Sequence, residues 1–299
     1  MSDRTAVTDQ ARRPRPRRIG LWCALAVLIG LVLYAFAVPL FVDHDTRIVD
    51  YTIAGVAPSA DHPLGTDPAG RDLFIRVALG LRLSLTIALI VAVASTVLGT
   101  AVGVIAGFVG GAVDQVLMRT SDTVNALPHL ILSLVIVAMF RGSVPAIIVA
   151  LVLSHWVTTA RIIRAQTLSM RNSEVIASAW LSGMGRGQII RHHLVPAALG
   201  QALISVLLLV PHAVWHESTF SFLGIGLPPH EPSLGTLLSD AEGGLLLGQW
   251  WLLVFPGGAL IAAVLAVGVA GRALTARITG AEVRWPRNVA RKPGPSGPG

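Results

Sequence analysis

The chain consists of long apolar runs separated by short polar stretches. Six runs contain roughly the 20 apolar residues that an α-helix needs to cross a bilayer core of about 30 Å. Pro128 and His129 interrupt the start of the third run, so its boundary is the least defined. The pattern predicts an all-α membrane protein with six transmembrane helices, at approximately Ile19 to Phe41, Leu83 to Val109, Val124 to Phe140, Val144 to Ile163, Leu199 to Phe222 and Trp250 to Ala270.

Composition excludes an ordinary soluble globular protein. The 299 residues are 53% hydrophobic and only 13% charged. A net charge of +7 would suggest nucleic acid as the partner of a soluble chain, but here the basic residues lie at both ends and between apolar runs. We therefore expect a lipid bilayer and no nucleic acid as partner. The single cysteine, Cys23, lies in the first apolar run, which excludes a disulfide framework or a cysteine metal site within this chain.

The distribution of Arg and Lys predicts the orientation, because cytoplasmic loops carry an excess of both. With the N-terminus inside, the basic groups in 4–18, 161–191 and 272–292 are cytoplasmic, as is Arg119. The outer side keeps only Arg47, Arg71, Arg76, Arg82 and Arg141. Both termini are therefore expected in the cytoplasm.

This topology divides the chain into a disordered basic cytoplasmic tail at 1–18, a transmembrane domain at 19–279 and a disordered cytoplasmic tail at 280–299. Within the domain we expect outer loops at 42–82 and 224–249 and a cytoplasmic loop at 164–198. A signal peptide is the alternative for the first run, because Ala35 to Ala37 resembles a cleavage site. The length of that run and the spans that follow favour an uncleaved helix.

The cytoplasmic loop contains the stretch "SEVIASAWLSGMGRGQIIRHHLVP", residues 173–196. A short helix is expected at its start, with Ser173 as the N-cap and Glu174 at the positive N-terminal end. Its apolar surface would consist of Val175, Ile176, Ala179 and Trp180.

Glycines at 183, 185 and 187 are expected to end that short helix, and a second helical run leads to Pro196, which we expect to open the fifth span. A short, partly apolar helix joined to two spans is suited to dock in a groove on another protein. The alternative is an amphipathic helix that lies on anionic lipid headgroups.

The stretch resembles the cytoplasmic loop of permease subunits in binding-protein-dependent ABC importers. Their signature is E-A-A, three residues, Gly, nine residues and I-x-L-P. Gly183 and Pro196 match it, with Leu194 at the apolar position. The initial triplet falls on Ala177, Ser178 and Ala179, so its glutamate is missing, and Glu174 lies one helical turn earlier. The resemblance implies that these residues couple the permease to its ATPases.

Two further strings resemble the C-type subunits of dipeptide and oligopeptide permeases. The first is "HPLGTDPAGRDLFIRVALGLRLSL" at 62–85, and the second is "ESTFSFLGIGLPP" at 217–229, where the subfamily shows E-A-S-x-S-F-L-G-x-G and then a proline pair. The family marker in the first string comprises Gly65, Thr66, Asp67, Gly70, Arg71 and Asp72. The matches to the second are Glu217, Ser221, Phe222, Leu223, Gly224, Gly226, Pro228 and Pro229.

The first string has a simple local interpretation. Asp67 is expected to cap a helix that Pro68 begins, and Asp67 with Arg71, then Asp72 with Arg76, have i,i+4 spacing. Exposed pairs of this kind contribute only tenths of a kcal/mol. We therefore favour an amphipathic segment that stabilises the outer surface over one that contacts the substrate.

Polar residues inside predicted spans usually face the protein interior. Glu217 is a candidate for lining the translocation path or for interhelical hydrogen bonding, and Ser221 and Phe222 are further path candidates. His212 and His216 have i,i+4 spacing, but without further ligands we predict no metal site. His155 and Trp156 are expected to serve as packing and interface anchors.

The sequence shows neither a nucleophile with its catalytic partners nor a phosphate-binding loop of the form G-x-x-x-x-G-K-[ST]. We therefore predict no catalytic residues, no ATP hydrolysis and no bound cofactor for this chain. The resemblance implies the type I ABC importer permease fold in a bacterial cell membrane. It also implies a homologous second permease, two cytoplasmic ATPase subunits that bind ATP and Mg, and an extracytoplasmic protein that delivers di- or oligopeptides. Import of nickel or another small cargo, a passive channel and a membrane enzyme remain as alternatives.

Overall fold

The computed structural model describes residues 18–42, 48–228 and 230–282. In these ranges five helices are long and apolar enough to cross a membrane, and a sixth span exists if one sharply bent helix pair is counted as a unit. The prediction of an all-α, multi-pass membrane protein is thereby confirmed. The five helices are α1 (Arg18–Phe41), α2 (Leu73–Val109), α5 (Val144–Arg171), α8 (Val195–Phe222) and α10 (Trp251–Glu282).

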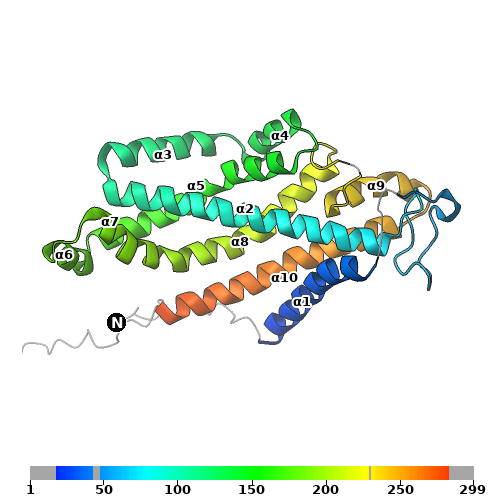
Figure 1. Ribbon diagram of the computed structural model, residues 1–299, viewed down its shortest axis with the longest axis horizontal. Coiled ribbons are helices and arrows are strands. Elements are labelled where there is room, and N and C mark those ends of the chain that lie inside the picture. The colour runs from blue at the N-terminus through cyan, green and yellow to red at the C-terminus, as the bar shows by residue number, and fades with distance from the viewer. Residues whose placement is uncertain (1–17, 43–47, 229, 283–299) are drawn as a thin grey trace, which may run out of the picture.

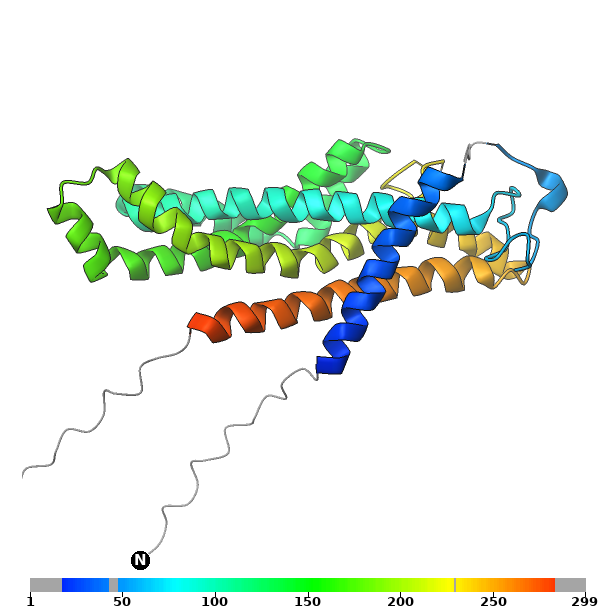
Figure 2. The same ribbon diagram turned by 60° about the horizontal axis from the view of Figure 1, so that its bottom comes forward.

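Four long helices, α2, α5, α8 and α10, run along the length of the molecule (Figure 1). The short helices α6 (Glu174–Leu181) and α7 (Arg186–Ile189) lie at one end, called here the α6 end. Helix α9 (Leu234–Leu246) and the segment before α2, which contains a 3₁₀ turn at Tyr51–Ile53, lie at the opposite α9 end. Helix α1 packs against α10 and α2 and crosses them obliquely (Figure 2).

The third predicted span is not a single straight helix. The prediction of one continuous helix there is wrong. Its place is taken by α3 (Gly111–Ala126) and α4 (His129–Met139), which meet at an angle of 81°. Leu127 between them is extended, because a residue before proline avoids the α-helical region, and Pro128 then precedes α4.

The predicted loops are shorter than expected because helices extend into them. The outer loop at 42–82 ends early, since α2 begins at Leu73, where the Asp72 side chain accepts hydrogen bonds from the N–H groups of Phe74 and Ile75. The outer loop at 224–249 contains α9. In the cytoplasmic loop at 164–198, α5 continues to Arg171 and α8 starts at Val195.

Pro196 lies in the first turn of α8, as predicted, but the helical path does not begin there. The helical path is continuous from α7 through a π-helical turn at Ile190–Leu194 into α8. The N–H of Val195 donates to the carbonyl of Ile190, which is the wider π pattern. Proline lacks an N–H and its ring clashes with the carbonyl of residue i−4, so a widened turn just before Pro196 lets the helix continue.

The centre of the bundle is the contact between α2 and α5, where main chains approach closely. A Cβ atom added to Gly99 would lie 2.6 Å from the carbonyl oxygen of Trp156, and one added to Gly103 would lie 2.6 Å from that of Ala160. Small residues at such positions let membrane helices pack main chain against main chain. The contact between α2 and α5 is the most extensive helix–helix contact among the described residues.

The expected disordered tails concern residues outside the described ranges, 1–17 and 283–299. Residues 280–282, which were assigned to the C-terminal tail, belong to α10. Arg47 and Pro229 also lie outside the described residues.

Candidate functional site

Helix α6 is held on the bundle by a small apolar core. Ile176 and Ala179 are buried on its inner side, and the ring of Trp180 stacks at 6.3 Å, nearly parallel, on that of Phe108 from α2. The core joins α6 to three longer elements, and its other members are Val104, Phe108, Ile163, Ile189, Leu194 and Ala198. A displacement of α6 would therefore act on α2, α5 and α8 together.

The opposite side of α6 is open to solvent. Leu181 is 90% exposed and Val175 57% exposed, although both are large apolar residues. Trp180 is 45% exposed as well, and the other exposed positions are three of the candidate coupling residues, Glu174, Ala177 and Ser178. We call the exposed residues Glu174, Val175, Ala177, Ser178 and Leu181 the outer face of α6. It combines an apolar contact area with low bulk, which suits docking against another protein.

Gly183 ends α6 as predicted, and its conformation requires glycine. Its φ angle is +78°, in the left-handed region. The N–H of Gly183 donates to the carbonyl of Trp180, and the N–H of Met184 donates to that of Ala179, which together form a Schellman motif. At the other end Ser173 occupies the predicted N-cap position, but its side chain makes no capping hydrogen bond. Pro196 is exposed and Leu194 is buried.

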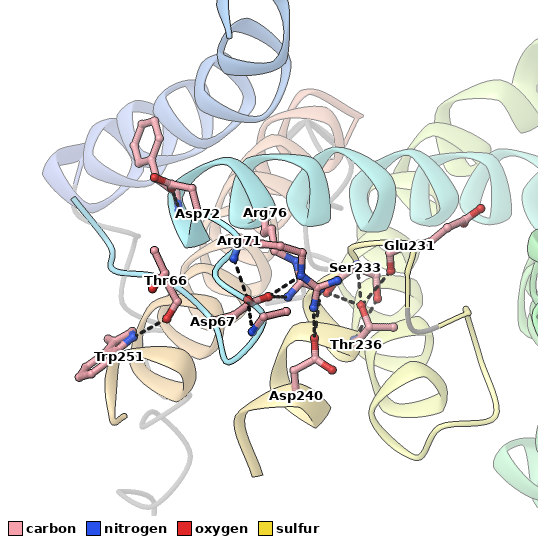
Figure 3. Close-up of polar contacts among 12 residues, drawn as sticks. Thr66, Asp67, Arg71, Asp72, Arg76, Glu231, Ser233, Thr236, Asp240 and Trp251 are labelled. Atoms are coloured by element: carbon pink, nitrogen blue, oxygen red, sulfur yellow. Dashed lines mark hydrogen bonds and ion pairs between the residues drawn. The ribbon is translucent and has the colours of Figure 1, made fainter. Parts of the chain in front are cut away.

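At the α9 end, the family-marker residues form a buried ionic network (Figure 3). The Asp67 side chain is 1% exposed and accepts hydrogen bonds from Arg71 Nε at 2.7 Å and Arg76 Nη1 at 2.5 Å. Arg76 also donates from Nη2 to Asp240 of α9 at 3.0 Å. The expected Asp72–Arg76 pair is replaced by these contacts, and the expected exposure of the charges is wrong, because α9 covers them.

The remaining marker residues fold the loop onto α10. The indole N–H of Trp251 donates to the carbonyl of Thr66, and the Thr66 hydroxyl donates to the carbonyl of Ile53 and accepts from the N–H of Val56. Gly65 and Gly70 have φ angles near +77°, and a Cβ on Gly70 would collide with the carbonyl of Asp50.

Asp67 does not cap α2. Its side chain instead accepts from the N–H groups of Ala69 and Arg71, while Asp72 caps the helix and bonds His62 Nδ1 at 2.9 Å. The marker string is therefore a structural element. Sequence reasoning missed its partners Asp240 and Trp251, which lie far along the chain.

Glu217 is completely buried in α8 and bonds to another helix. Its Oε2 accepts a hydrogen bond from Ser84 of α2 at 2.6 Å, and its Oε1 accepts one from Ser221 at 2.9 Å. Both serine hydroxyls in turn accept main-chain N–H groups, from Leu234 and Leu227 respectively. The structure thus places Glu217 in the interhelical role. The path-lining role of Glu217, Ser221 and Phe222 stays a prediction.

Three histidines from three helices meet near Glu217. The rings of His129 (α4), His155 (α5) and His216 (α8) have centroids 5.1 to 6.1 Å apart. His216 is buried, and in the described part of the chain its Nδ1 has no hydrogen-bond partner. Within the same described residues, no group of three or more His, Cys, Asp or Glu is arranged to hold a metal ion. Sequence spacing paired His216 with His212 and gave no signal for the cluster.

The chain is similar to a known protein family and to several known proteins. Residues 99–280 match the family model described as binding-protein-dependent transport system inner membrane component. The chain is 33% identical to the oligopeptide transport system permease protein OppC of Bacillus subtilis, over 89% of this chain and 87% of that protein. It is 38% identical to OppC of Escherichia coli K12, over 85% and 84%. It is 33% identical to the dipeptide transport system permease protein DppC of Bacillus subtilis, over 83% and 77%.

Proposed function

Because the chain belongs to the family of binding-protein-dependent transport system inner membrane components, we propose that it is the permease subunit of an ATP-driven importer of oligopeptides or dipeptides in a bacterial cell membrane. The relatives described above are named for oligopeptide and dipeptide transport, which favours peptides over nickel as cargo. The chain contributes to the translocation path and is not itself an enzyme.

The energy for transport comes from partner subunits in this proposal. The sequence has no phosphate-binding loop of the G-x-x-x-x-G-K-[ST] form, so ATP and Mg belong to two ATPase subunits that dock at the α6 end. A second, homologous permease completes the path, and a substrate-binding protein delivers peptide at the α9 end. Membership of the family supports the ATPase and binding-protein partners, and the second permease is part of this proposal.

The main structural support for this proposal is the outer face of α6. It combines the exposed apolar side chains of Val175 and Leu181 with small or polar neighbours, on a short helix whose inner side is packed against the spans. Closure of the ATPase pair would push α6, and the shared core would pass this movement to α2, α5 and α8. The path would then switch between inward and outward access, and hydrolysis would reset it.

The charge distribution supports a cytoplasmic α6 end. Arg171, Arg186 and Arg191 lie there, close to the membrane helix ends where the Arg and Lys excess determines orientation. At the α9 end, in contrast, Arg71 and Arg76 are neutralised by Asp67 and Asp240. Both chain termini then lie in the cytoplasm.

The first experiment is mild detergent extraction from the native membrane, followed by mass and composition of the recovered complex. Recovery with a second permease and two ATPase subunits is the expected outcome. Recovery of the chain alone or as a homo-oligomer, even after crosslinking, contradicts the proposal and favours a channel or a membrane enzyme.

The second experiment tests coupling in that complex. Gly183→Pro cannot adopt the φ of +78° that ends α6, because proline fixes φ near −65°. Ala177→Arg places a bulky charge on the outer face. Both variants should insert normally but hydrolyse ATP without peptide uptake. Gly187→Ala is the matched control, since a Cβ there meets no atom within 4 Å. Unchanged uptake in both test variants would refute the coupling role of α6.

A further inference from the structure

Two polar stripes face each other across a cleft between α5 and α8. On α5 the stripe contains His155, Thr158 and Thr159, and on α8 it contains Gln201, Ser205 and His212. His155 lies three and four residues before Thr158 and Thr159, and Gln201, Ser205 and His212 are four and seven residues apart, so each set lies along one side of its helix. The cleft has a volume of about 250 Å³, and apolar residues complete its lining.

The polar groups of this cleft are available to a ligand. In the part of the chain that the structure describes, the side chains of Thr158, Gln201 and Ser205 have no hydrogen bond to another residue. Other hydroxyls on the same helices do bond to the main chain, as Thr167 does to Ile163 and Thr219 to Trp215. At the cleft, Thr158, Gln201 and Ser205 lack such a partner, and all three line the same space.

Lipid is a poor occupant for this surface. A polar group moved into hydrocarbon without a hydrogen-bond partner costs several kcal/mol, so polar residues at membrane depth usually face a protein interior or a water-filled cavity. Simple interhelical bonding does not explain them either, because these side chains do not bond across the gap. The lining therefore favours a water-filled cleft over one filled by lipid.

Interactions between helices lie near both ends of the cleft. Toward the α6 end, Gln166 Nε2 of α5 donates to the carbonyl of Ala197 of α8 at 2.9 Å. Toward the α9 end, the rings of His155 and His216 meet at 5.1 Å, with His129 of α4 beside them. The volume of the cleft is below the range of about 300 to 1,000 Å³ that is typical of complete small-molecule sites. It is thus suited to be one wall of a larger path.

The chemistry of the residues that line the cleft indicates which kind of ligand it can bind. Its lining residues include no Asp, Glu, Lys or Arg and offer hydroxyl, amide and imidazole groups that donate and accept hydrogen bonds. The main-chain N–H and C=O groups of a peptide require both hydrogen-bond acceptors and hydrogen-bond donors as partners. A fixed charge would instead select for one class of side chain.

We propose that the α5–α8 cleft is the wall of the translocation path along which this chain contacts the main chain of the peptide, with Thr158, Gln201 and Ser205 as its hydrogen-bonding positions. This inference rests on the proposed function and identifies the surface that performs it. Peptides with different side chains can share this wall because every residue carries the same main-chain groups.

The test is cysteine modification in reconstituted membranes that contain the complete importer. Cys23→Ser gives a background without cysteine, and Thr158→Cys and Ser205→Cys are then introduced singly. Leu203→Cys is the matched control, since Leu203 is 49% exposed on another face of α8. A charged, membrane-impermeant methanethiosulfonate should modify the cleft cysteines about tenfold faster than the control, because the reactive thiolate forms where water reaches the sulfur. Trialanine turnover should slow this modification, and modification should block trialanine uptake.

The outcomes separate the two proposals. Normal trialanine uptake combined with equal modification rates at Ser205→Cys and Leu203→Cys overturns the cleft and leaves the importer function intact. Fast modification in a complex that imports no peptide overturns the importer function and the peptide as occupant. Ser205→Ala and Gln201→Leu give an independent measurement, since loss of main-chain contacts should raise the KM for trialanine. An unchanged KM in both variants contradicts the hydrogen-bonding role.

Discussion

Arg76 donates a hydrogen bond from Nη1 to Oδ2 of Asp67 at 2.5 Å, and both side chains are almost completely buried. The Nη2 of the same guanidinium reaches Asp240 of α9 at 3.0 Å. A single side chain in the first turn of α2 therefore holds together the marker loop and a helix from the last part of the chain. Buried charges of this kind are sensitive to the loss of one partner, which leaves the other charge without compensation.

Replacing Arg76 with methionine should destabilise the protein strongly. Loss of one partner of a buried ion pair typically costs about 3 to 5 kcal/mol, and the value here should be near the lower end because Arg71 still bonds Asp67 at 2.7 Å. The measurement is the free energy of unfolding in detergent. Arg82→Met is the control, because Arg82 lies over the ring of Phe36, 5.6 Å from its centroid, without a carboxylate partner in the described residues. Equal losses of unfolding free energy in Arg76→Met and Arg82→Met would contradict the stabilising role of the ionic network.

The bond between Glu217 and Ser84 predicts a graded response to substitution. Glu217→Leu removes both acceptors and leaves the buried hydroxyls of Ser84 and Ser221 without their partner, at about 1 to 3 kcal/mol for each unsatisfied group. Glu217→Gln keeps one acceptor oxygen and should therefore lose less stability than Glu217→Leu. The midpoint of thermal unfolding should therefore be highest for the wild type, lower for Glu217→Gln and lowest for Glu217→Leu.

A double-mutant cycle isolates this contact. Ser84→Ala combined with Glu217→Leu should destabilise less than the sum of the two single changes, because both remove the bond between Ser84 and Glu217. Additive losses would show that Ser84 and Glu217 act independently, contrary to the 2.6 Å separation of their oxygens.

Sequence patterns sufficed for features that depend on neighbouring residues. Runs of apolar residues located α1, α5, α8 and α10, and Gly183 indicated the end of α6 because a glycine turn is a local signal. The family-marker loop was recognised as a string, but its helix start was placed too early, since both Asp67 and Asp72 have the chemistry of a cap.

Features that depend on residues far apart in the chain could not be derived in this way. Arg76 and Asp240 are 164 positions apart, and Ser84 and Glu217 are 133 apart. The i,i+4 rule assigned Arg76 to Asp72, because a helix-surface rule takes no account of α9 covering that surface. The histidine cluster likewise combines side chains of α4, α5 and α8, and no spacing within one helix predicts it.

Asp50 gives a prediction for the dependence on pH. The Thr52 hydroxyl, and then the Thr52 N–H, donate to its carboxylate and hold the pKa of Asp50 below its ordinary value. A lowered folded-state pKa means that the stabilisation of this turn is present above the unfolded-state pKa and is lost as pH falls through the lowered value. Carboxyl ¹³C shifts should show titration of Asp50 below the ordinary aspartate range, and Thr52→Val should move its pKa upward. An unchanged titration in that variant would contradict the assigned cause.

The close approach of α2 and α5 predicts that Gly103 tolerates no side chain. A Cβ atom there would lie 2.6 Å from the carbonyl oxygen of Ala160 and 2.8 Å from Cβ of Ile163, and neither is the flexible end of a side chain. Gly103→Ala must therefore separate the two helices, and overpacking of this kind typically costs about 1 to 3 kcal/mol.

Gly258→Ala in α10 is the matched control, because a Cβ there meets no atom within 4 Å and alanine favours a helix over glycine by about 1 kcal/mol. Thermal unfolding in detergent should show a lower midpoint for Gly103→Ala and an equal or higher one for Gly258→Ala. Helix α2 also contributes part of the core beneath α6. Gly103→Ala should therefore lose the coupling between ATP hydrolysis and peptide uptake at temperatures where it is still folded. A stable and fully coupled Gly103→Ala protein would show that α2 and α5 are not in direct main-chain contact.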